Sequence, residues 1–591
     1  MASKKKEELS YGQMPLPQSR KAYKITKRSW SGLNYRQTID TGLLSMEQNI
    51  STDESPYLTP SPKQSLYYSG YQHPISMFGF DNFLIVIYRH EADNTIRVDY
   101  ITSPDAVHTG ILKKSGATVD DEYPRSIVQF NVYDTPTDPV TGEYVKKLLI
   151  FPDKASMDFN FKSVERIPDE PENMVTYHTT SNGKDIYTVY DVNGECVEYE
   201  DYFPITDMNV TVKEYYSETE EEIEGGSKIY PPPDSANRNY YYHNKYNNET
   251  YKWSEYEAED GSIEHNWRVS LPPNIPNIKY ATVHLSRVFG VDDDRVYASG
   301  YNDYANWNLD TVGEYNESNS WCSPAQSNTK AGGQFTGITT YQGHVICFKR
   351  DFMHEIYNTK NPFRLQDIFG EGTIDNRTIQ DVDGKLIFVS EDNVKIYTGS
   401  NPRIISYYLN IGEYKSAISG TDGRCYYLYC EDNEYNKRFF VYDTITEQWS
   451  ERNIEADIGL INFAHNKNGM YMLCDSGDIY KIDTQNYSHR WSFETDLITN
   501  QTVDIKHIRK MQMFAQLDQN SWIKVYVLYD DEEFNENSHL VYSSNDTGQI
   551  AIRVKPRQTA NYGIKLHIEG CGYAKLYELE LILESGGDLY I

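Results

Sequence analysis

Four glycine-led blocks in the second half of the chain constrain its fold more than any other sequence feature. They begin at Gly343, Gly384, Gly423 and Gly469, which lie 41, 39 and 46 residues apart. The first two, GHVICFKRDFMHEIYN and GKLIFVSEDNVKIYTG, share a glycine turn, an apolar strand, a charged hairpin tip and a second strand ending in Ile-Tyr. This spacing is typical of four-stranded propeller blades. The blocks therefore predict an all-β fold built on a β-propeller of six to eight blades.

Strand patterns before these blocks extend the predicted propeller over residues 66–485. Candidate early-blade strands are 83–90, 96–102, 146–152 and 183–199. At about 201–280 the pattern breaks into a polar, acidic, tyrosine-rich stretch. We interpret it as an insertion where a partner could bind, although a passive surface loop explains it equally well.

The two ends of the chain have sequence patterns that differ from those of the predicted propeller. Residues 1–65 have weak periodicity and predict an extended N-terminal arm, with Leu43, Leu44 and Met46 as candidate anchors. Residues 486–591 alternate apolar and polar side chains over several strands, which predicts a C-terminal β-sandwich buried on one face. The apolar positions are Ile523, Val525, Val527, Ile550, Ile552, Val554, Ile564, Leu566, Ile568, Leu579, Leu581 and Leu583.

Charge is distributed unevenly along the chain. The formal net charge is −31, which argues against general binding to nucleic acid or to an anionic membrane. Residues 1–36 instead contain nine Lys or Arg residues and only two acidic residues, Glu7 and Glu8. This basic arm could dock on the acidic surface of a neighbouring subunit or touch phosphates, or it could be a merely solubilising terminus.

Cysteine usage and hydropathy bear on where the protein is made. The seven cysteines include no CxxC pair, and Cys425 and Cys430 fall on opposite faces of one predicted strand, so we expect reduced thiols and synthesis in a cytoplasm. No secretory signal is visible. The longest apolar run, Phe83–Tyr88, is far too short to span a bilayer. The 52 tyrosines favour a β-rich protein with much half-exposed interface.

Candidate chemical sites have simpler structural explanations. Asp292–Asp294, Asp381, Asp383 and Asp422 fall where hairpin tips are expected, and turn formation explains them better than a metal does.

His344 and His354 lie on two strands of one predicted blade, and a metal site would need a third ligand that the sequence does not supply. Cys474-Asp475-Ser476-Gly477 hints at a sialidase-type box but also reads as a hairpin turn. No GxSxG, HExxH or phosphate-binding glycine loop is present. We therefore expect no enzyme, no catalytic, cofactor-binding or metal-binding residues, and no cofactor.

One segment resembles a recurring blade of tailed-bacteriophage virion proteins. In that blade an Arg-(Leu/Val)-Phe-Gly strand leads to Arg-(Val/Ile)-Tyr-x-Ser and then to a Trp segment. Here 287–290 are RVFG, 295–299 are RVYAS, and Trp307 follows. Residues 333–357 and 374–399 look like the next two blades. The likeness extends over 280–585, and the segment 31–60 looks like the opening arm of such proteins. The acidic insertion before 280 departs from the family pattern, which leaves the outer partner open.

This family includes tail hub or nozzle components and packaged-DNA stabilisation proteins. The resemblance implies a homo-hexameric ring in the virion tail that continues the DNA channel below the portal and adaptor and supports tail fibres. DNA would pass through without specific binding, since an acidic lumen repels phosphates. An alternative is a tail-tip adhesin whose insertion binds host glycan, and a weaker one is a propeller glycosidase.

Overall fold

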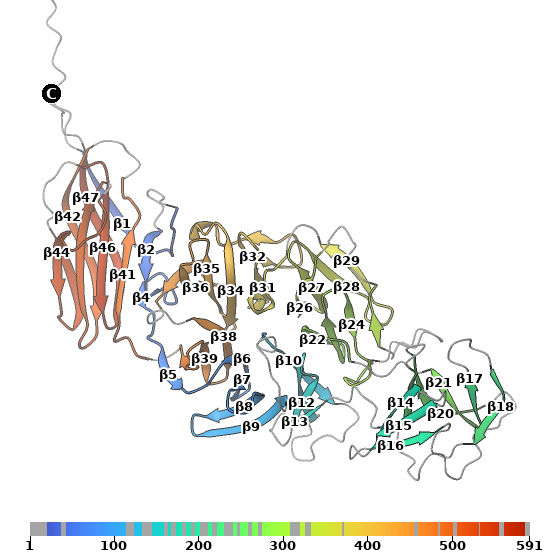
Figure 1. Ribbon diagram of the computed structural model, residues 1–591. Coiled ribbons are helices and arrows are strands. Elements are labelled where there is room, and N and C mark those ends of the chain that lie inside the picture. Colours follow the sequence, from blue (N-terminus) through green and yellow to red (C-terminus); the bar gives the residue numbers. More distant parts are fainter. Residues whose placement is uncertain are drawn as a thin grey trace, which may run out of the picture. The chain divides into compact units, whose positions relative to one another are not determined.

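The computed structural model describes residues 21–36, 43–113, 123–132, 145–158, 275–307, 320–324, 333–368, 372–453, 459–482, 485–499, 505–530, 532–554 and 561–585. Between 164 and 269 it describes only the backbone of the strands. The described residues form strands and two 3-10 helices, η2 (Asn376–Thr378) and η3 (Tyr407–Leu409), with no α-helix among them (Figure 1). None of the described helices has the length and apolar character that a membrane span requires. The predicted all-β class is confirmed.

The chain divides into two compact units. Unit one comprises 1–71, 79–82 and 380–591, and unit two comprises 72–78 and 83–379. Within the described residues, unit two contains four antiparallel sheets, each of four strands consecutive in sequence. These are β6–β9 (Pro74–Phe80, Phe83–His90, Thr95–Ser103, Ala106–Lys113), β10–β13 (Ser126–Val132, Val145–Phe151, Ala155–Asp158, Val164–Arg166), β22–β25 (Tyr280–His284, Arg287–Val291, Val296–Ala298, Trp321–Cys322) and β26–β29 (Phe335–Tyr341, His344–Lys349, Met353–Tyr357, Arg364–Ile368). Neighbouring sheets contact one another through β9 and β13, β10 and β22, and β22 and β26.

A separate sheet of unit two has a different topology. Its six strands follow the order β16-β15-β14-β19-β20-β21 (Cys196–Glu200, Asp185–Tyr190, Asn173–Thr179, Tyr240–Asn244, Glu249–Glu257, Ile263–Val269), and β17 and β18 (Thr211–Tyr215, Glu222–Ile229) form a hairpin. The insertion was expected to begin near residue 201, but strands before and after that position belong to this one sheet. Residues 183–199, interpreted above as an early blade, therefore belong with the insertion strands. Their hairpin pattern fitted either sheet, since local alternation does not specify which strands pair.

Unit one contains three further four-stranded sheets in its described part. They are β30–β33 (Gln380–Val382, Lys385–Val389, Val394–Tyr397, Arg403–Ile404), β34–β37 (Tyr414–Thr421, Cys425–Asp432, Lys437–Asp443, Gln448–Arg452) and β38-β39-β40-β5 (Leu460–Asn466, Gly469–Cys474, Ile479–Lys481, Ser65–Tyr68). The fourth strand of the last sheet comes from near the N-terminus, because β5 pairs antiparallel with β40. In Figure 1 the blue strand β5 lies beside the brown strands of this sheet.

The glycine-led blocks correspond to the inner hairpins of four of these sheets. Turns at Gln342-Gly343 and Asp383-Gly384 lead into the second strand, and both residues of each turn have positive φ (47° and 80°, 52° and 71°). Positive φ at both central residues defines the type I′ turn, whose twist matches that of the flanking strands. The glycines thus fix the hairpin, and the apolar strands that follow are buried. Phe388 in β31, for example, is fully buried.

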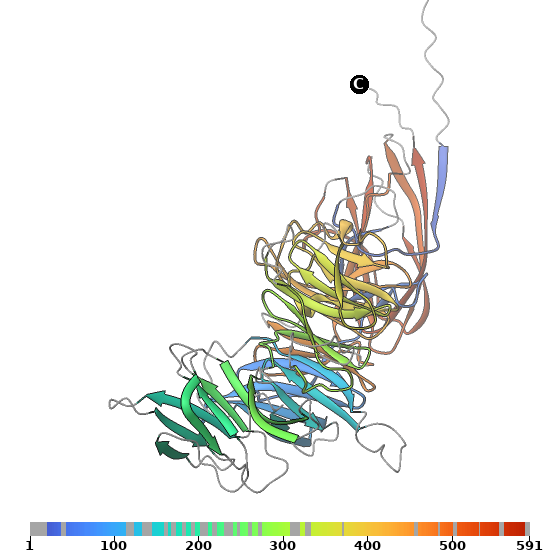
Figure 2. The ribbon, with the colours of Figure 1, turned by 90° about the vertical axis from the view of Figure 1, so that its right-hand side faces the viewer.

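Two larger sheets of unit one share a single apolar core, and we call them the C-terminal sheet pair. One has the order β1-β47-β42-β45 (Lys21–Lys27, Ala574–Ser585, Lys506–Leu517, Gly548–Val554), and the other β2-β41-β46-β43-β44 (Leu44–Gln48, Arg490–Thr495, Ile564–Cys571, Trp522–Tyr529, His539–Ser544). Figure 2 shows the blue strand β1 running along the red strands. The alternating positions predicted from the sequence are buried in this core, except Ile550, which packs against it half-buried.

The architecture is therefore an all-β protein with many four-stranded antiparallel sheets, consistent with a β-propeller. The described cysteines are free thiols. Cys425 and Cys430 are both buried in β35 and form no disulfide, as their spacing predicted.

Candidate functional site

The N-terminal arm (1–65) is built into the C-terminal sheet pair. Strand β1 pairs along its whole length with β47, from Lys21 opposite Ser585 to Lys27 opposite Leu579. Trp30 then enters the core, where it is 1% exposed. Its ring packs edge-on against Phe493 at 5.6 Å, and its Nε1 donates a hydrogen bond of 3.1 Å to the Tyr577 carbonyl. The described part of the arm is thus part of the fold rather than a free extension.

Basic residues of the arm meet acidic groups of the same chain. Lys24 Nζ lies 2.7 Å from Glu580, at an exposed position where such a pair adds little stability. Lys27 Nζ lies 3.0 Å from Asp496, whose side chain is only 2% exposed. These contacts occupy two of the charges that were expected to seek an acidic partner. Docking of the arm on a neighbouring subunit stays a prediction, and residues 1–20 lie outside the described residues.

A cluster of ionisable groups fixes the next part of the arm to β37. The Tyr35 hydroxyl donates to Glu451, and Arg438 donates two hydrogen bonds of 3.0 Å to the same carboxylate. The Arg438 guanidinium also lies 4.4 Å from the centre of the Tyr35 ring. Burial, and then the charge of Glu451, raise the pKa of the Tyr35 hydroxyl. In this cluster the Arg438 guanidinium and the Tyr35 hydroxyl group both donate to the Glu451 carboxylate.

Glu47 of β2 completes this cluster and is fully buried. One of its carboxyl oxygens accepts a hydrogen bond of 3.2 Å from the Glu451 backbone N–H, and the other has no hydrogen-bond partner. Burial raises the pKa of Glu47 well above its ordinary value. This setting favours the protonated form of the Glu47 carboxyl group, because a second buried anion beside Glu451 would be unfavourable.

An exposed aromatic pair lies beside the arm. Tyr407 and Tyr408 of η3 are 56% and 42% exposed. The Arg36 guanidinium stacks 3.9 Å from the centre of the Tyr407 ring. Both tyrosines line a cavity of about 220 Å³, together with Leu43 and Trp449. Aromatic and arginine side chains are enriched in protein interfaces, so this surface is suited to contact with a partner protein.

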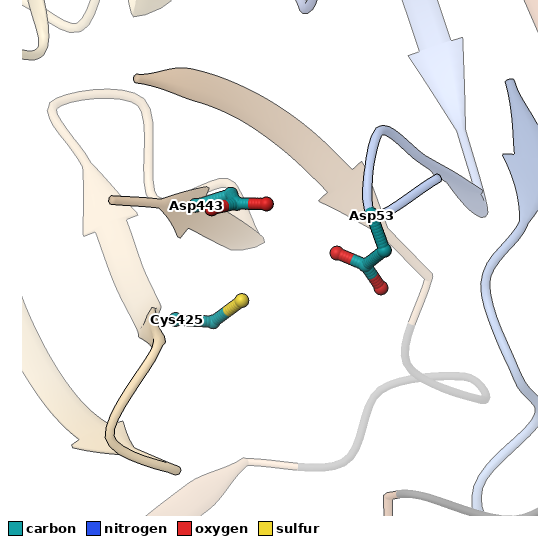
Figure 3. A group of neighbouring side chains, drawn as sticks. All are labelled: Asp53, Cys425 and Asp443. Atoms are coloured by element: carbon teal, nitrogen blue, oxygen red, sulfur yellow. The ribbon is translucent and has the colours of Figure 1, made fainter. Parts of the chain in front are cut away.

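One group of side chains has metal-ligating chemistry. Ligand atoms of Asp53, Cys425 and Asp443 lie within 4.8 Å of one another, and Figure 3 shows the three side chains pointing into a common space. Asp443 already accepts a hydrogen bond of 2.5 Å from Arg424 and one of 2.8 Å from the Ile445 N–H. Burial, and then nearby carboxylates, raise the pKa of the Cys425 thiol. Arg424 thus already supplies a positive charge to the Asp443 carboxylate within this group.

The two histidines considered above contact separate carboxylates. His344 Nδ1 lies 3.0 Å from Glu355, and His354 Nδ1 lies 2.8 Å from Asp367. His354 is fully buried, and burial lowers its pKa. Each histidine thus has its own carboxylate, which matches the structural role inferred from the sequence.

Two of the hairpin aspartates, Asp292 and Asp422, act as turn caps. Asp292 Oδ1 accepts from the N–H groups of residues 294 and 295, and its Oδ2 accepts from the Tyr297 hydroxyl at 2.7 Å. Asp422 repeats the arrangement, accepting from the N–H groups of residues 424 and 425 and from the Tyr427 hydroxyl at 2.8 Å. A carboxylate five residues before a tyrosine thus closes two turns in the same way, and turn formation accounts for both residues.

Cys474 to Gly477 also form a turn. The Gly477 N–H donates to the Cys474 carbonyl at 3.0 Å, which closes the hairpin between β39 and β40. The Asp475 carboxylate accepts from the Gly459 N–H at 3.1 Å. These contacts give the segment the turn structure anticipated as its simpler interpretation.

Sequence reasoning identified the anchors of the arm but missed the polar cluster beside them. Leu44 is fully buried as predicted, while Leu43 and Met46 are half-buried. The sequence held one weak indication of this cluster: the acidic Glu47 lies three residues after the apolar Leu43-Leu44 pair. The side chains of the tyrosine-rich insertion lie outside the described residues.

No protein-family model and no curated protein matches the chain. Among solved structures, a puromycin hydrolase matches with a TM-score of 0.25 and 8% identity, over 72% of this chain and 59% of that chain. A puromycin-hydrolyzing peptidase of Mycobacterium tuberculosis matches with a TM-score of 0.25 and 9% identity, over 73% and 62%. A chain of a mitotic checkpoint complex matches with a TM-score of 0.22 and 9% identity, over 47% and 91%. The chain thus spans about three fifths of the length of the two hydrolases. Likenesses this distant carry no functional argument.

Proposed function

We propose that this chain is a structural protein of a tailed-bacteriophage virion, forming a homo-hexameric ring in the tail that continues the DNA channel. The observation that carries the proposal is the blade motif in its structural setting. Residues 287–291 form β23 and 296–298 form β24, which are adjacent strands of one sheet, and Trp307 is 1% exposed. The sheets β26–β29 and β30–β33 follow in the order that the resemblance implies.

The finer architecture belongs to the same proposal. On this proposal the four-stranded sheets of β5–β13 and β22–β40 are propeller blades, seven within the described residues, which falls in the predicted range of six to eight. The strand β5 completes the last blade, and the C-terminal sheet pair is the predicted β-sandwich. A propeller has short, protected sheet edges, which makes it a stiff wall element.

Electrostatics supports a conduit over a nucleic-acid-binding role. The net charge of −31 repels phosphates, so a duplex passing such a wall would stay mobile. The exposed Tyr407 and Tyr408 offer a contact surface for a second copy, for portal or adaptor proteins, or for tail fibres. The adhesin alternative rested on the insertion, whose side chains are not described.

The proposal is tested by mass photometry and negative-stain imaging of the full-length chain, alone and mixed with the portal and adaptor proteins of the same phage. We expect six-fold rings, either free or on the portal complex. The same protein should appear in proteomics of purified virions at the copy number of other tail-ring components. A chain that stays monomeric with portal and adaptor, and is missing from virions, would contradict the proposal.

A further inference from the structure

A second cavity lies on the C-terminal sheet pair and shares no lining residue with the cavity beside Tyr407 and Tyr408. Its volume is about 620 Å³, within the range of about 300–1,000 Å³ common for ligand sites. We call it the aromatic groove and define it by six of its lining residues: Arg28, Tyr57, Phe514, Gln549, Tyr577 and Glu578. They come from the arm and from the adjacent strands β42, β45 and β47. All of these elements belong to unit one.

Phe514 contributes a large exposed apolar side chain to the groove. It is 38% exposed, between Met513 and Ala515, which are each 1% exposed. The pairing of β42 with β47 shifts register between these two neighbours, which marks a β-bulge. A bulge redirects side chains and is common beside binding sites. Phe514 makes no ring contact with another described aromatic residue, so one large apolar ring faces solvent in the groove.

The two tyrosines are held in fixed orientations. Their ring centres lie 5.0 Å apart at an interplanar angle of 67°. Lys575 Nζ lies 4.8 Å from the centre of the Tyr57 ring, and the Tyr577 hydroxyl donates 2.8 Å to Gln516 Oε1. Because these contacts already restrict both rings, a ligand that stacks on them loses little additional side-chain entropy on binding.

The polar groups of the groove are available to a ligand. The side chains of Arg28, Gln549 and Glu578 form no hydrogen bond or ion pair with any other described residue, including one another. They supply a guanidinium, an amide and a carboxylate, which together offer several donors and acceptors. The groove therefore combines one positive and one negative charge, on a chain whose formal net charge is −31.

We propose that the aromatic groove binds a neutral oligosaccharide. A pyranose ring presents an apolar C–H face that packs on aromatic rings, and its rim of hydroxyls both donates and accepts hydrogen bonds. Phe514 and Tyr577 would provide the stacking surface, and Arg28, Gln549 and Glu578 the hydroxyl partners. Glu578 would repel an anionic ligand and Arg28 would repel a cationic one, so the balanced charge of the groove favours a neutral ligand. This site lies outside the insertion and does not depend on the proposed tail function.

The test uses the full-length chain with three neutral trisaccharides, chitotriose, cellotriose and maltotriose, and with trigalacturonate as the anionic comparison. Saturation-transfer NMR reports stacking, and calorimetry gives the affinity. We expect at least one neutral sugar to bind with transfer to its C–H protons. Phe514→Ala and Tyr577→Ala should each weaken that binding by about tenfold or more.

Two controls separate binding from folding. Phe514→Tyr keeps the stacking ring and should retain affinity, and Tyr562→Ala removes a 59% exposed tyrosine of the same sheet pair that does not line the groove. Both variants should bind as the unmodified chain does. The proposal is overturned if no neutral trisaccharide binds, if Phe514→Ala leaves the affinity unchanged, or if trigalacturonate binds best. It is also overturned if Phe514→Ala instead abolishes self-association, since the groove would then be a contact between copies.

Discussion

Replacing Trp30 tests whether the arm belongs to the fold of its own chain. The ring is 1% exposed and packs on Phe493, and its Nε1 donates to the Tyr577 carbonyl. Trp30→Ala should therefore lower the stability of the C-terminal sheet pair by about 3–5 kcal/mol, the usual range for a buried aromatic residue. Trp30→Phe keeps most of the buried ring but leaves that carbonyl without its donor, which should cost about 1–2 kcal/mol.

Hydrogen exchange is the suitable assay, because a chain with two units need not unfold in a single step. Peptides from β42 and β47 should lose protection in Trp30→Ala, whereas peptides from β7 and β8 in unit two serve as the internal reference. Unchanged protection of β47 in Trp30→Ala would refute the packing argument. A loss that grows on dilution would show that the arm is supplied by another copy.

Three further substitutions extend the test to other sites. Phe388→Ala should destabilise its sheet by about 3–5 kcal/mol in urea unfolding, while Tyr435→Ala at a 71% exposed position should be nearly neutral. Asp422→Ala removes two N–H contacts and the Tyr427 hydroxyl contact, and should lower the thermal midpoint of unfolding more than Asp381→Ala. Burial raises the pKa of Glu47 in the folded chain. Above the ordinary pKa of 4.5 the unfolded chain releases this proton while the folded chain keeps it. The free energy of unfolding should therefore fall as the pH rises from 4.5 through the raised pKa. Glu47→Gln should flatten that fall between pH 5 and pH 8, measured by urea unfolding, and an unchanged slope would contradict the assignment.

Local patterns predicted the hairpins well. Gly343 and Gly384 marked turns that require positive φ, and alternation from Ile523 onward gave the buried face of the sheet pair. These features are encoded within a few residues, because a turn conformation and a two-residue period depend only on near neighbours.

Long-range pairing could not be predicted in the same way. The strands β1, β2 and β5 pair with β47, β41 and β40, hundreds of residues later in the chain. Nothing in Lys21–Lys27 itself specifies its partner, since any half-apolar strand can pair at several edges. Similarly, the buried Glu47 accepts its hydrogen bond from the backbone of Glu451, which lies about 400 residues later in the sequence.

The pairing of β5 with β40 also has a consequence for synthesis. The two strands are separated by about 400 residues, so at a typical rate of about 5–20 residues per second the first waits roughly 20–80 s on the ribosome for its partner. During that time residues 65–68 expose an unpaired strand edge, which in crowded polysomes can be captured by a neighbouring nascent chain. The first strand of this sheet to be synthesised is thus the last to be paired, and translation through residue 481 is a condition for the sheet to close.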